Sequence, residues 1–175
     1  MRRLLKTEAF VLRRKQLLEK DAVIILLTET TGKLPVIAKG VHSITSRRLA
    51  SLMTGNLIQV VLSQTKETYY LQQVKTISLF SRIKKSPEGL RQAYFFLYLA
   101  DNLLPEQQQE QPAYVKIKKI MIALSKASFS PAEELSACKD FLLVLGYRLK
   151  ADTFSQCMVE IEEITGKKVP AVLYN

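Results

Sequence analysis

The sequence predicts two domains, a small β-barrel at the amino end and a compact set of helices after it. Up to residue 80 of the 175-residue chain, short segments rich in β-branched and aromatic residues are bounded by turn residues, a pattern typical of strands. From Ser86-Pro87 onward, apolar residues recur at spacings of three and four, a pattern typical of helices. We therefore expect a barrel at residues 1–80 and a helical domain with a short carboxy-terminal tail at residues 81–175.

Five strands are expected in the barrel domain, at residues 7–14, 22–28, 33–40, 56–64 and 68–79. Gly32 supplies the positive φ of a tight turn between the second and third strands. A short helical turn is expected at residues 49–53, between the third and fourth strands. Five strands with a short helix at this place favour an oligonucleotide-binding (OB) barrel, and an SH3-like barrel is the main alternative.

The last strand carries a mixed pattern. Strict alternation places Tyr69 and Leu71 on the same face as Gln73 and Lys75. Neither face is purely apolar, so we expect this strand to run from the rim of the barrel into its core.

Three helices and a shorter fourth are expected after the barrel, at residues 87–104, 113–127, 131–145 and 158–165. Ser86 is the predicted N-cap of the first helix, and Ser130 with Glu133 forms a predicted capping box on the third. Gly146 and Gly166 are the predicted stops of the last two. The side chains expected to face inward on the second helix are Val115, Ile120, Met121, Ile122 and Leu124.

Positive charge is concentrated in the barrel domain. Residues 1–80 carry 13 basic and 5 acidic side chains, which accounts for +8 of the net charge of +10, whereas residues 81–175 carry 13 basic and 11 acidic side chains. A compact β-domain with this excess favours a partner that supplies negative charge, most commonly nucleic-acid phosphate. The alternative is a solvated surface without a partner.

Eight residues of the barrel domain are candidates for contact with nucleic acid. Basic groups at strand ends and in one loop can follow a phosphate backbone, and a tyrosine ring can stack on a base. The candidates are Arg13, Arg14, Lys15, Lys33, Lys39, Arg47, Arg48 and Tyr69, with Tyr70 as an equal alternative to Tyr69. Phe10 and Phe80 are expected in the core. With so few aromatic rings, recognition would depend on backbone charge and have little sequence preference.

The four aromatic residues at positions 94, 95, 96 and 98 cover most of a helix circumference. We expect core packing there, and a groove for a partner's peptide is the alternative.

We find no pattern for catalysis or for metal binding in the sequence. There is no Gly-rich phosphate loop and no paired-carboxylate motif, and the single histidine, His42, has no acid close in sequence to orient it. Cys138 and Cys157 are interpreted as thiols in a reducing compartment. The longest apolar runs, 22–27 and 141–145, are far shorter than the roughly 20 residues of a membrane span. We expect no enzymatic activity, no cofactor, no metal, no membrane partner and a cytoplasmic location.

Several short motifs resemble the amino-terminal domain of the bacterial DNA repair protein RecO. They are Glu8-Ala9-Phe10-Val11-Leu12-Arg13, Glu19-Lys20-Asp21, Gly32-Lys33, Ala38-Lys39-Gly40 and Ser46-Arg47. A weaker likeness to the helical domain of that family runs through residues 97–105 and 141–147. The resemblance implies an OB barrel joined to a helical domain, and it assigns DNA contact to Lys39 and Arg47, with Arg13 and Arg14 next to the first motif.

The same resemblance implies a recombination mediator. Such proteins bind single- and double-stranded DNA, anneal complementary strands, and help to load RecA together with a RecR-like partner and the tail of the single-strand-binding protein. Association with the bacterial nucleoid would follow. Two departures from the family pattern stand out: Val41-His42-Ser43 occupies a stretch where further arginines are usual, and Glu160 stands where a zinc-binding element would have its second cysteine.

Two other functions are consistent with the residues alone. A protein-docking adaptor could use the basic barrel to hold an acidic partner. An RNA-binding accessory factor of translation could use the same barrel, because OB barrels serve both nucleic acids.

Overall fold

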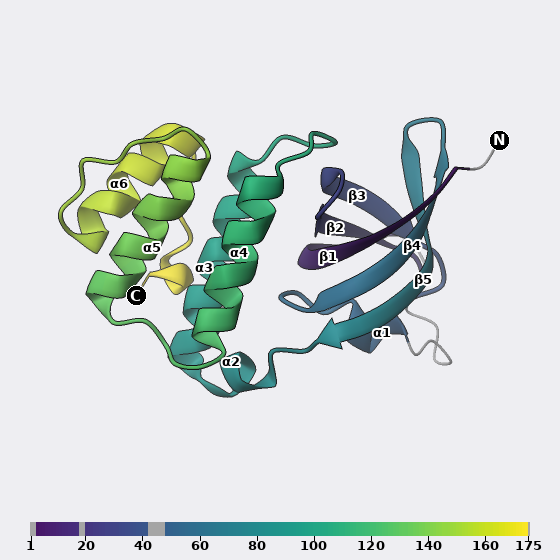
Figure 1. Ribbon diagram of the computed structural model, residues 1–175, viewed down its shortest axis with the longest axis horizontal. Coiled ribbons are helices and arrows are strands. Elements are labelled where there is room, and N and C mark those ends of the chain that lie inside the picture. The colour runs from purple at the N-terminus through teal and green to yellow at the C-terminus, as the bar shows by residue number, and fades with distance from the viewer. Residues whose placement is uncertain (1–2, 18–19, 42–47, 175) are drawn as a thin grey trace. The chain divides into compact units, whose positions relative to one another are not determined.

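The structure, a computed structural model, describes residues 3–17, 20–41 and 48–174 (Figure 1). It divides into two compact units. The barrel unit consists of Met1–Phe80 and Leu104–Tyr114, and the helical unit consists of Ser81–Leu103 and Val115–Asn175. The first division falls between Phe80 and Ser81, and a segment distant in sequence is added to the barrel unit.

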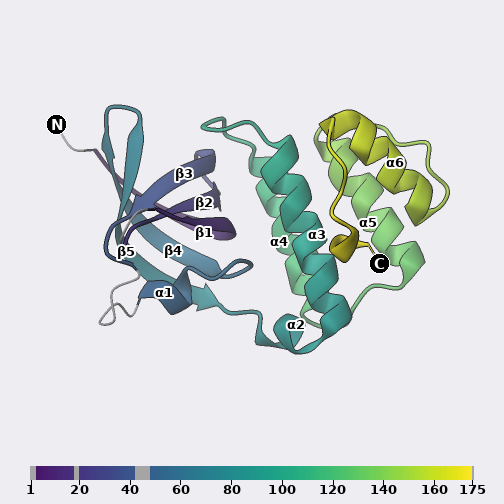
Figure 2. The same cartoon turned by 180° about the vertical axis from the view of Figure 1, so that it is seen from behind.

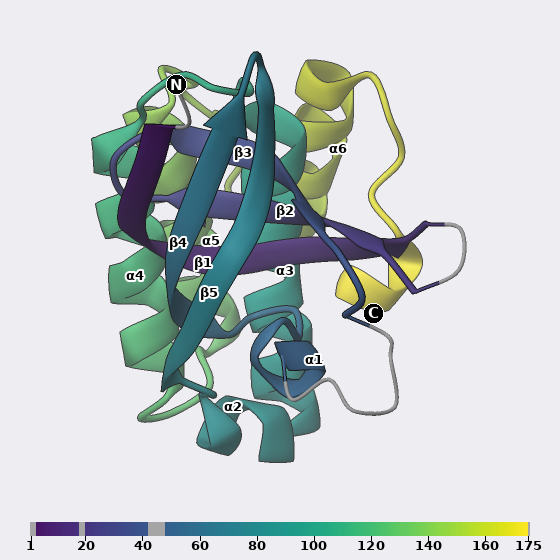
Figure 3. The ribbon, with the colours of Figure 1, turned by 90° about the vertical axis from the view of Figure 1, so that its right-hand side faces the viewer.

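The barrel unit is a closed barrel of five strands (Figure 3). The strands are β1 (Arg3–Gln16), β2 (Ala22–Thr28), β3 (Gly32–Ala38), β4 (Leu57–Thr65) and β5 (Thr68–Ser78). Around the barrel their order is β1-β2-β3-β5-β4, and β4 pairs with β1 to close it. The short helix α1 (Arg48–Ser51) lies between β3 and β4 in the chain. This arrangement confirms the predicted OB barrel.

Strand alternation builds the barrel core. Residues two apart on each strand point inward, as the pleat of a strand requires. The fully buried members include Ala9, Val11, Ile24, Leu26, Leu34, Val36, Ile58, Val60 and Leu62. Strand β1 is longer at both ends than the predicted segment 7–14, because it pairs with β4 from Arg3 and with β2 up to Gln16.

A β-bulge in β5 overturns the strict alternation predicted for that strand. Leu71 pairs with Leu62, but the next pair joins Gln73 to Val61, so Gln72 is an extra residue. An extra residue reverses the facing of the residues that follow it, here as far as a second irregularity at Ile77. Tyr69 and Leu71 therefore face inward before the bulge, whereas Gln73 and Lys75 are exposed after it. The strand changes face at Gln72; it does not run from rim to core.

The distant segment Leu104–Tyr114 packs on the barrel as part of the same unit. The backbone N–H of Gln107 donates to the carbonyl of Lys33 at 2.8 Å. The hydroxyl of Tyr114 donates to a carboxylate oxygen of Glu8, and its ring centroid lies 5.7 Å from that of Phe10. Burial, reinforced by the bond to Glu8, raises the pKa of Tyr114. Phe10 and Phe80 are buried as predicted.

The helical unit contains the remaining elements (Figure 2). They are α2 (Ser81–Lys85), α3 (Pro87–Leu103), most of α4 (Gln111–Leu124), α5 (Pro131–Val144), α6 (Phe154–Thr165) and the 3-10 turn η1 (Ala171–Leu173). The predicted capping box of Ser130 and Glu133 begins α5. Helix α6 starts four residues earlier than predicted, because Thr153 and Gln156 form a second capping box.

Helix α4 buries a different stripe from the one predicted. Its buried apolar residues Ile117, Ile120, Met121 and Leu124 follow helical spacing. Val115 and Ile122 lie off that stripe and are 40% and 44% exposed, so their predicted inward positions were wrong.

A polar network holds the helical unit together. The Arg91 guanidinium donates to Glu88, to Glu134 and to the carbonyl of Leu173, each at 2.6 Å. Glu134 is almost fully buried, so removing its cationic partner would leave a charge in the core. The contact with Leu173 orders the predicted tail. In this unit the thiols of Cys138 and Cys157 are free and buried, with their sulfurs 3.4 Å apart.

Gly32 provides a test of how the segment Leu104–Tyr114 docks. Its φ is +75°, and an added Cβ would lie 1.8 Å from the carbonyl oxygen of Gln108. Gly40 has a similar φ of +62° with nothing within 4 Å of an added Cβ. We expect Gly32→Ala to lower the free energy of unfolding by about 3 kcal/mol and Gly40→Ala by about 1 kcal/mol. Denaturant unfolding of the full chain measures both; equal losses would contradict this docking.

Candidate nucleic-acid interface

A row of paired residues crosses the outer face of the barrel. Lys15 of β1 pairs with Val23 of β2, Val23 pairs with Ile37 of β3, and Ile37 pairs with Tyr70 of β5. Directly paired residues of adjacent strands lie on the same face of a sheet. The row therefore begins at an exposed ammonium group, continues over two half-buried aliphatic side chains, and ends at a half-buried tyrosine ring.

The end of β3 brings two cations to this tyrosine. Lys39 follows β3, and its Nζ lies 5.5 Å from the centroid of the Tyr70 ring. Arg48, the first residue of α1, donates from Nη2 to the carbonyl of Lys39 at 2.7 Å. An ammonium group over an aromatic face is attracted by the ring quadrupole. The contact therefore holds Lys39 and Tyr70 together at the barrel surface.

These residues line a cavity of about 420 Å³, which we call the Tyr70 pocket. Its lining residues are Lys39, Arg48, Ser63, Thr65, Tyr70, Leu71 and Gln72. The bulge residue Gln72 donates from its side-chain amide to the Ser63 hydroxyl at 2.8 Å. The pocket thus combines two cations, one aromatic ring and several hydrogen-bonding groups.

A hydrogen bond fixes the backbone that carries Lys39. The N–H of Gly40 donates to Oδ1 of Asp21 at 2.8 Å, and the N–H of Leu17 donates to the carbonyl of Asp21 at 2.9 Å. The ends of β1, β2 and β3 are therefore tied together beside the pocket. Within the part of the chain that the structure describes, Lys15, Lys39 and Arg48 have no ion-pair partner.

Four of the predicted contact residues lie on this face of the barrel. Lys15, Lys39 and Arg48 belong to the row or to the Tyr70 pocket, as described above. Arg13 is exposed two residues before Lys15 on β1 and so shares its face. Half of the eight predicted contact residues thus share one face of the barrel.

Other candidates lie elsewhere. Arg14 points to the opposite face of β1, with Nη1 3.6 Å from the sulfur of Met53. Lys33 is only 8% exposed, because the segment Leu104–Tyr114 covers the start of β3. Arg47 and His42 lie outside the described residues. The cationic face of the barrel therefore contains fewer residues than the eight that were predicted to contact nucleic acid.

The position of Tyr69 contradicts the prediction that its ring stacks on a base. It is 7% exposed and belongs to the barrel core, so its ring cannot stack on a base. Tyr70, which was an equal candidate for stacking on a base, faces outward. Sequence reasoning missed Gln72, because a bulge leaves no signature in the pattern of polar and apolar residues around it.

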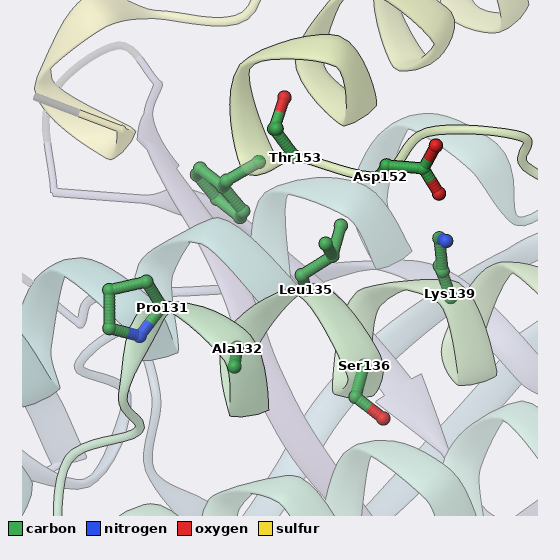
Figure 4. Close-up of a pocket in the computed structure, with 8 residues that line it drawn as sticks. Pro131, Ala132, Leu135, Ser136, Lys139, Asp152 and Thr153 are labelled. Carbon is green, nitrogen blue, oxygen red and sulfur yellow. The ribbon is translucent and has the colours of Figure 1, made fainter.

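A cavity in the helical unit has a different character. It measures about 570 Å³ and lies between α5 and the segment leading into α6. Figure 4 shows Pro131 and Ala132 at one end and Asp152 and Lys139 at the other. It holds one cation beside one carboxylate, so its charge does not favour phosphate. In the described ranges no three His, Cys, Asp or Glu side chains gather to hold a metal ion, and no helix is long and apolar enough to cross a membrane.

Comparison with known proteins identifies the barrel. Residues 1–80 match the family model described as "Recombination protein O N terminal". The first 80 residues of the chain are thus similar to the amino-terminal domain of the RecO family. The likeness to RecO inferred from the short motifs is thereby confirmed, and proteins that match the chain beyond the barrel carry the same name.

Three relatives called DNA repair protein RecO show how far the similarity to RecO extends. The protein of Thermoanaerobacter sp. (strain X514) is 28% identical over 156 residues, which cover 89% of this chain and 63% of the relative. That of Alkaliphilus metalliredigens (strain QYMF) is 30% identical over 105 residues, covering 60% and 43%. That of Roseiflexus sp. (strain RS-1) is 23% identical over 168 residues, covering 96% and 59%. The chain thus spans less than two thirds of the length of these relatives.

The opposite placement of the two adjacent tyrosines is testable. Tyr69→Ala empties part of the core and should lower the free energy of unfolding by about 3–5 kcal/mol. Tyr70→Ala truncates a surface ring and should cost about 1 kcal/mol or less. Denaturant unfolding followed by circular dichroism measures both values. A larger loss for Tyr70→Ala would reverse the assignment of core and surface.

Proposed function

We propose that the barrel unit binds DNA through the outer face that carries Arg13, Lys15, Lys39 and Arg48. The main support for this proposal is that Lys39 and Arg48 lie together at the rim of the Tyr70 pocket. Neither side chain has an acidic partner among the described residues. Cations placed in this way release condensed counterions when they contact phosphates, and that release drives binding. The similarity of residues 1–80 to the RecO family model supports DNA as the polyanion.

At the level of the whole chain, we propose a non-enzymatic role in DNA repair and recombination. The relatives' names support this role. Two single strands repel each other through their phosphates, and a basic surface that neutralises one backbone lowers this repulsion. Annealing of complementary strands is therefore an activity that the barrel face can support without any catalytic group.

The more specific parts of the proposal are based on the resemblance to RecO proteins. They are binding of both single- and double-stranded DNA, cooperation with a RecR-like partner and the tail of the single-strand-binding protein, and assistance in loading RecA. We propose that the protein works in the cytoplasm at the bacterial nucleoid. A complementary-strand annealing assay, with and without the single-strand-binding protein, tests this role; no acceleration under either condition would contradict it.

The salt dependence of binding tests the proposed face. Replacing two phosphate contacts should reduce the slope of log affinity against log salt by about 1.4 for a single strand. We expect this change in Lys39→Gln/Arg48→Gln, measured by titrating labelled single-stranded DNA at several salt concentrations.

The matched control is Lys126→Gln/Lys167→Gln, which removes the same charge from exposed sites of the helical unit and should leave the slope nearly unchanged. Equal slopes for wild type and the barrel variant would remove Lys39 and Arg48 from the site. A wild-type slope near zero would instead favour the adaptor, and strong preference for RNA of equal length would favour the RNA-binding factor.

A further inference from the structure

We propose that the Tyr70 pocket is a subsite for one unstacked base of single-stranded DNA, with Lys39 and Arg48 holding the adjoining phosphate. This inference rests on the proposed DNA binding and goes further, because it assigns strand selectivity to one side chain. The pocket, of about 420 Å³, lies in the range of about 300–1,000 Å³ usual for small-ligand sites.

The Lys39 side chain is in contact with the ring of Tyr70. The Lys39 ammonium lies over a face of the ring, 5.5 Å from its centroid. Such a contact at an exposed site is weaker than the stacking of a base on an aromatic ring. A base can therefore displace the ammonium group from the ring.

The displaced cation has a new partner close by. A base that stacks on Tyr70 carries its own phosphate to the rim of the pocket, where Lys39 and Arg48 lie. A charge-assisted bond from ammonium or guanidinium to phosphate is stronger than the cation–π contact that it replaces. The exchange is favourable for both groups, so base and phosphate bind together.

The polar side of the pocket suits the edge of a base. Gln72 is brought there by the β-bulge, and its amide already donates to Ser63 at 2.8 Å. A primary amide carries two N–H donors and one carbonyl acceptor, and this bond uses one of the donors. Gln72 can thus bond to a base edge, and an amide that both donates and accepts does not commit the pocket to one base.

Duplex DNA cannot use the subsite in this way. Its bases are paired and stacked inside the helix, and extruding one costs about as much free energy as stacking on Tyr70 returns. A duplex therefore leaves Lys39 on the ring or draws it to a phosphate, without any contribution from the aromatic face. The pocket should favour single strands even though the surrounding cations bind both forms.

The experiment compares three ligands of equal charge: a deoxythymidine oligonucleotide, an abasic oligonucleotide with the same number of phosphates, and a duplex with that number of phosphates. We expect Tyr70→Leu to weaken binding of the thymidine strand about 10-fold and binding of the other two less than 2-fold. The salt slope should not change, because no charge is removed. Tyr70→Phe, which keeps the ring, should bind all three like the wild type.

The control is Tyr147→Leu, which changes an exposed tyrosine of the helical unit and should affect none of the ligands. Unfolding curves establish that each variant is folded. An equal loss on all three ligands, or no loss on any, would overturn the subsite while leaving the proposed DNA binding intact. If the wild type binds none of the three, the proposed function itself fails, and the subsite fails with it.

Discussion

The parallel pairing of β3 with β5, over only two residue pairs, is the constraint on which the barrel and its surface depend. Val36 pairs with Tyr69, and Ile37 pairs with Tyr70. The first pair faces inward and completes the core, while the second faces outward and joins the row that begins at Lys15. A slip of one residue would exchange the two tyrosines, exposing a core ring and burying the one that meets Lys39. The same strand pairing therefore closes the barrel and forms the Tyr70 pocket.

The segment Leu104–Tyr114 sets the limits of the cationic face. It covers the start of β3, buries Lys33 and holds Phe10 beneath Tyr114. The end of β3 stays open, and Lys39 there remains exposed. Lys33 near the start of β3 and Lys39 just after its end thus have opposite roles, the first in packing and the second at the candidate interface.

The sequence allowed the fold class, the order of the strands along the chain and the starts of α3 and α5 to be predicted, because these depend on local patterns such as the capping box of Ser130. Lys39 is exposed and Arg48 is half-buried as the first residue of α1, and their contact with nucleic acid stays a prediction. The sequence could not separate Tyr69 from Tyr70, because both suit a strand and only the pairing with β3 decides which one is inside. Burial of Lys33 escaped prediction for a related reason: its cover comes from more than 70 residues further along the chain.

The discontinuous composition of the barrel unit has a consequence for how the protein emerges from the ribosome. All five strands are complete once Ser78 has been made, yet the last piece of the unit ends at Tyr114. Translation proceeds at roughly 5–20 residues per second, so the nascent barrel waits seconds for that piece. During this interval the Phe10 ring lacks its later cover, and an aromatic surface is open to chaperones or to neighbouring chains. The amino-terminal domain can therefore complete its fold only after part of the helical region has been synthesised.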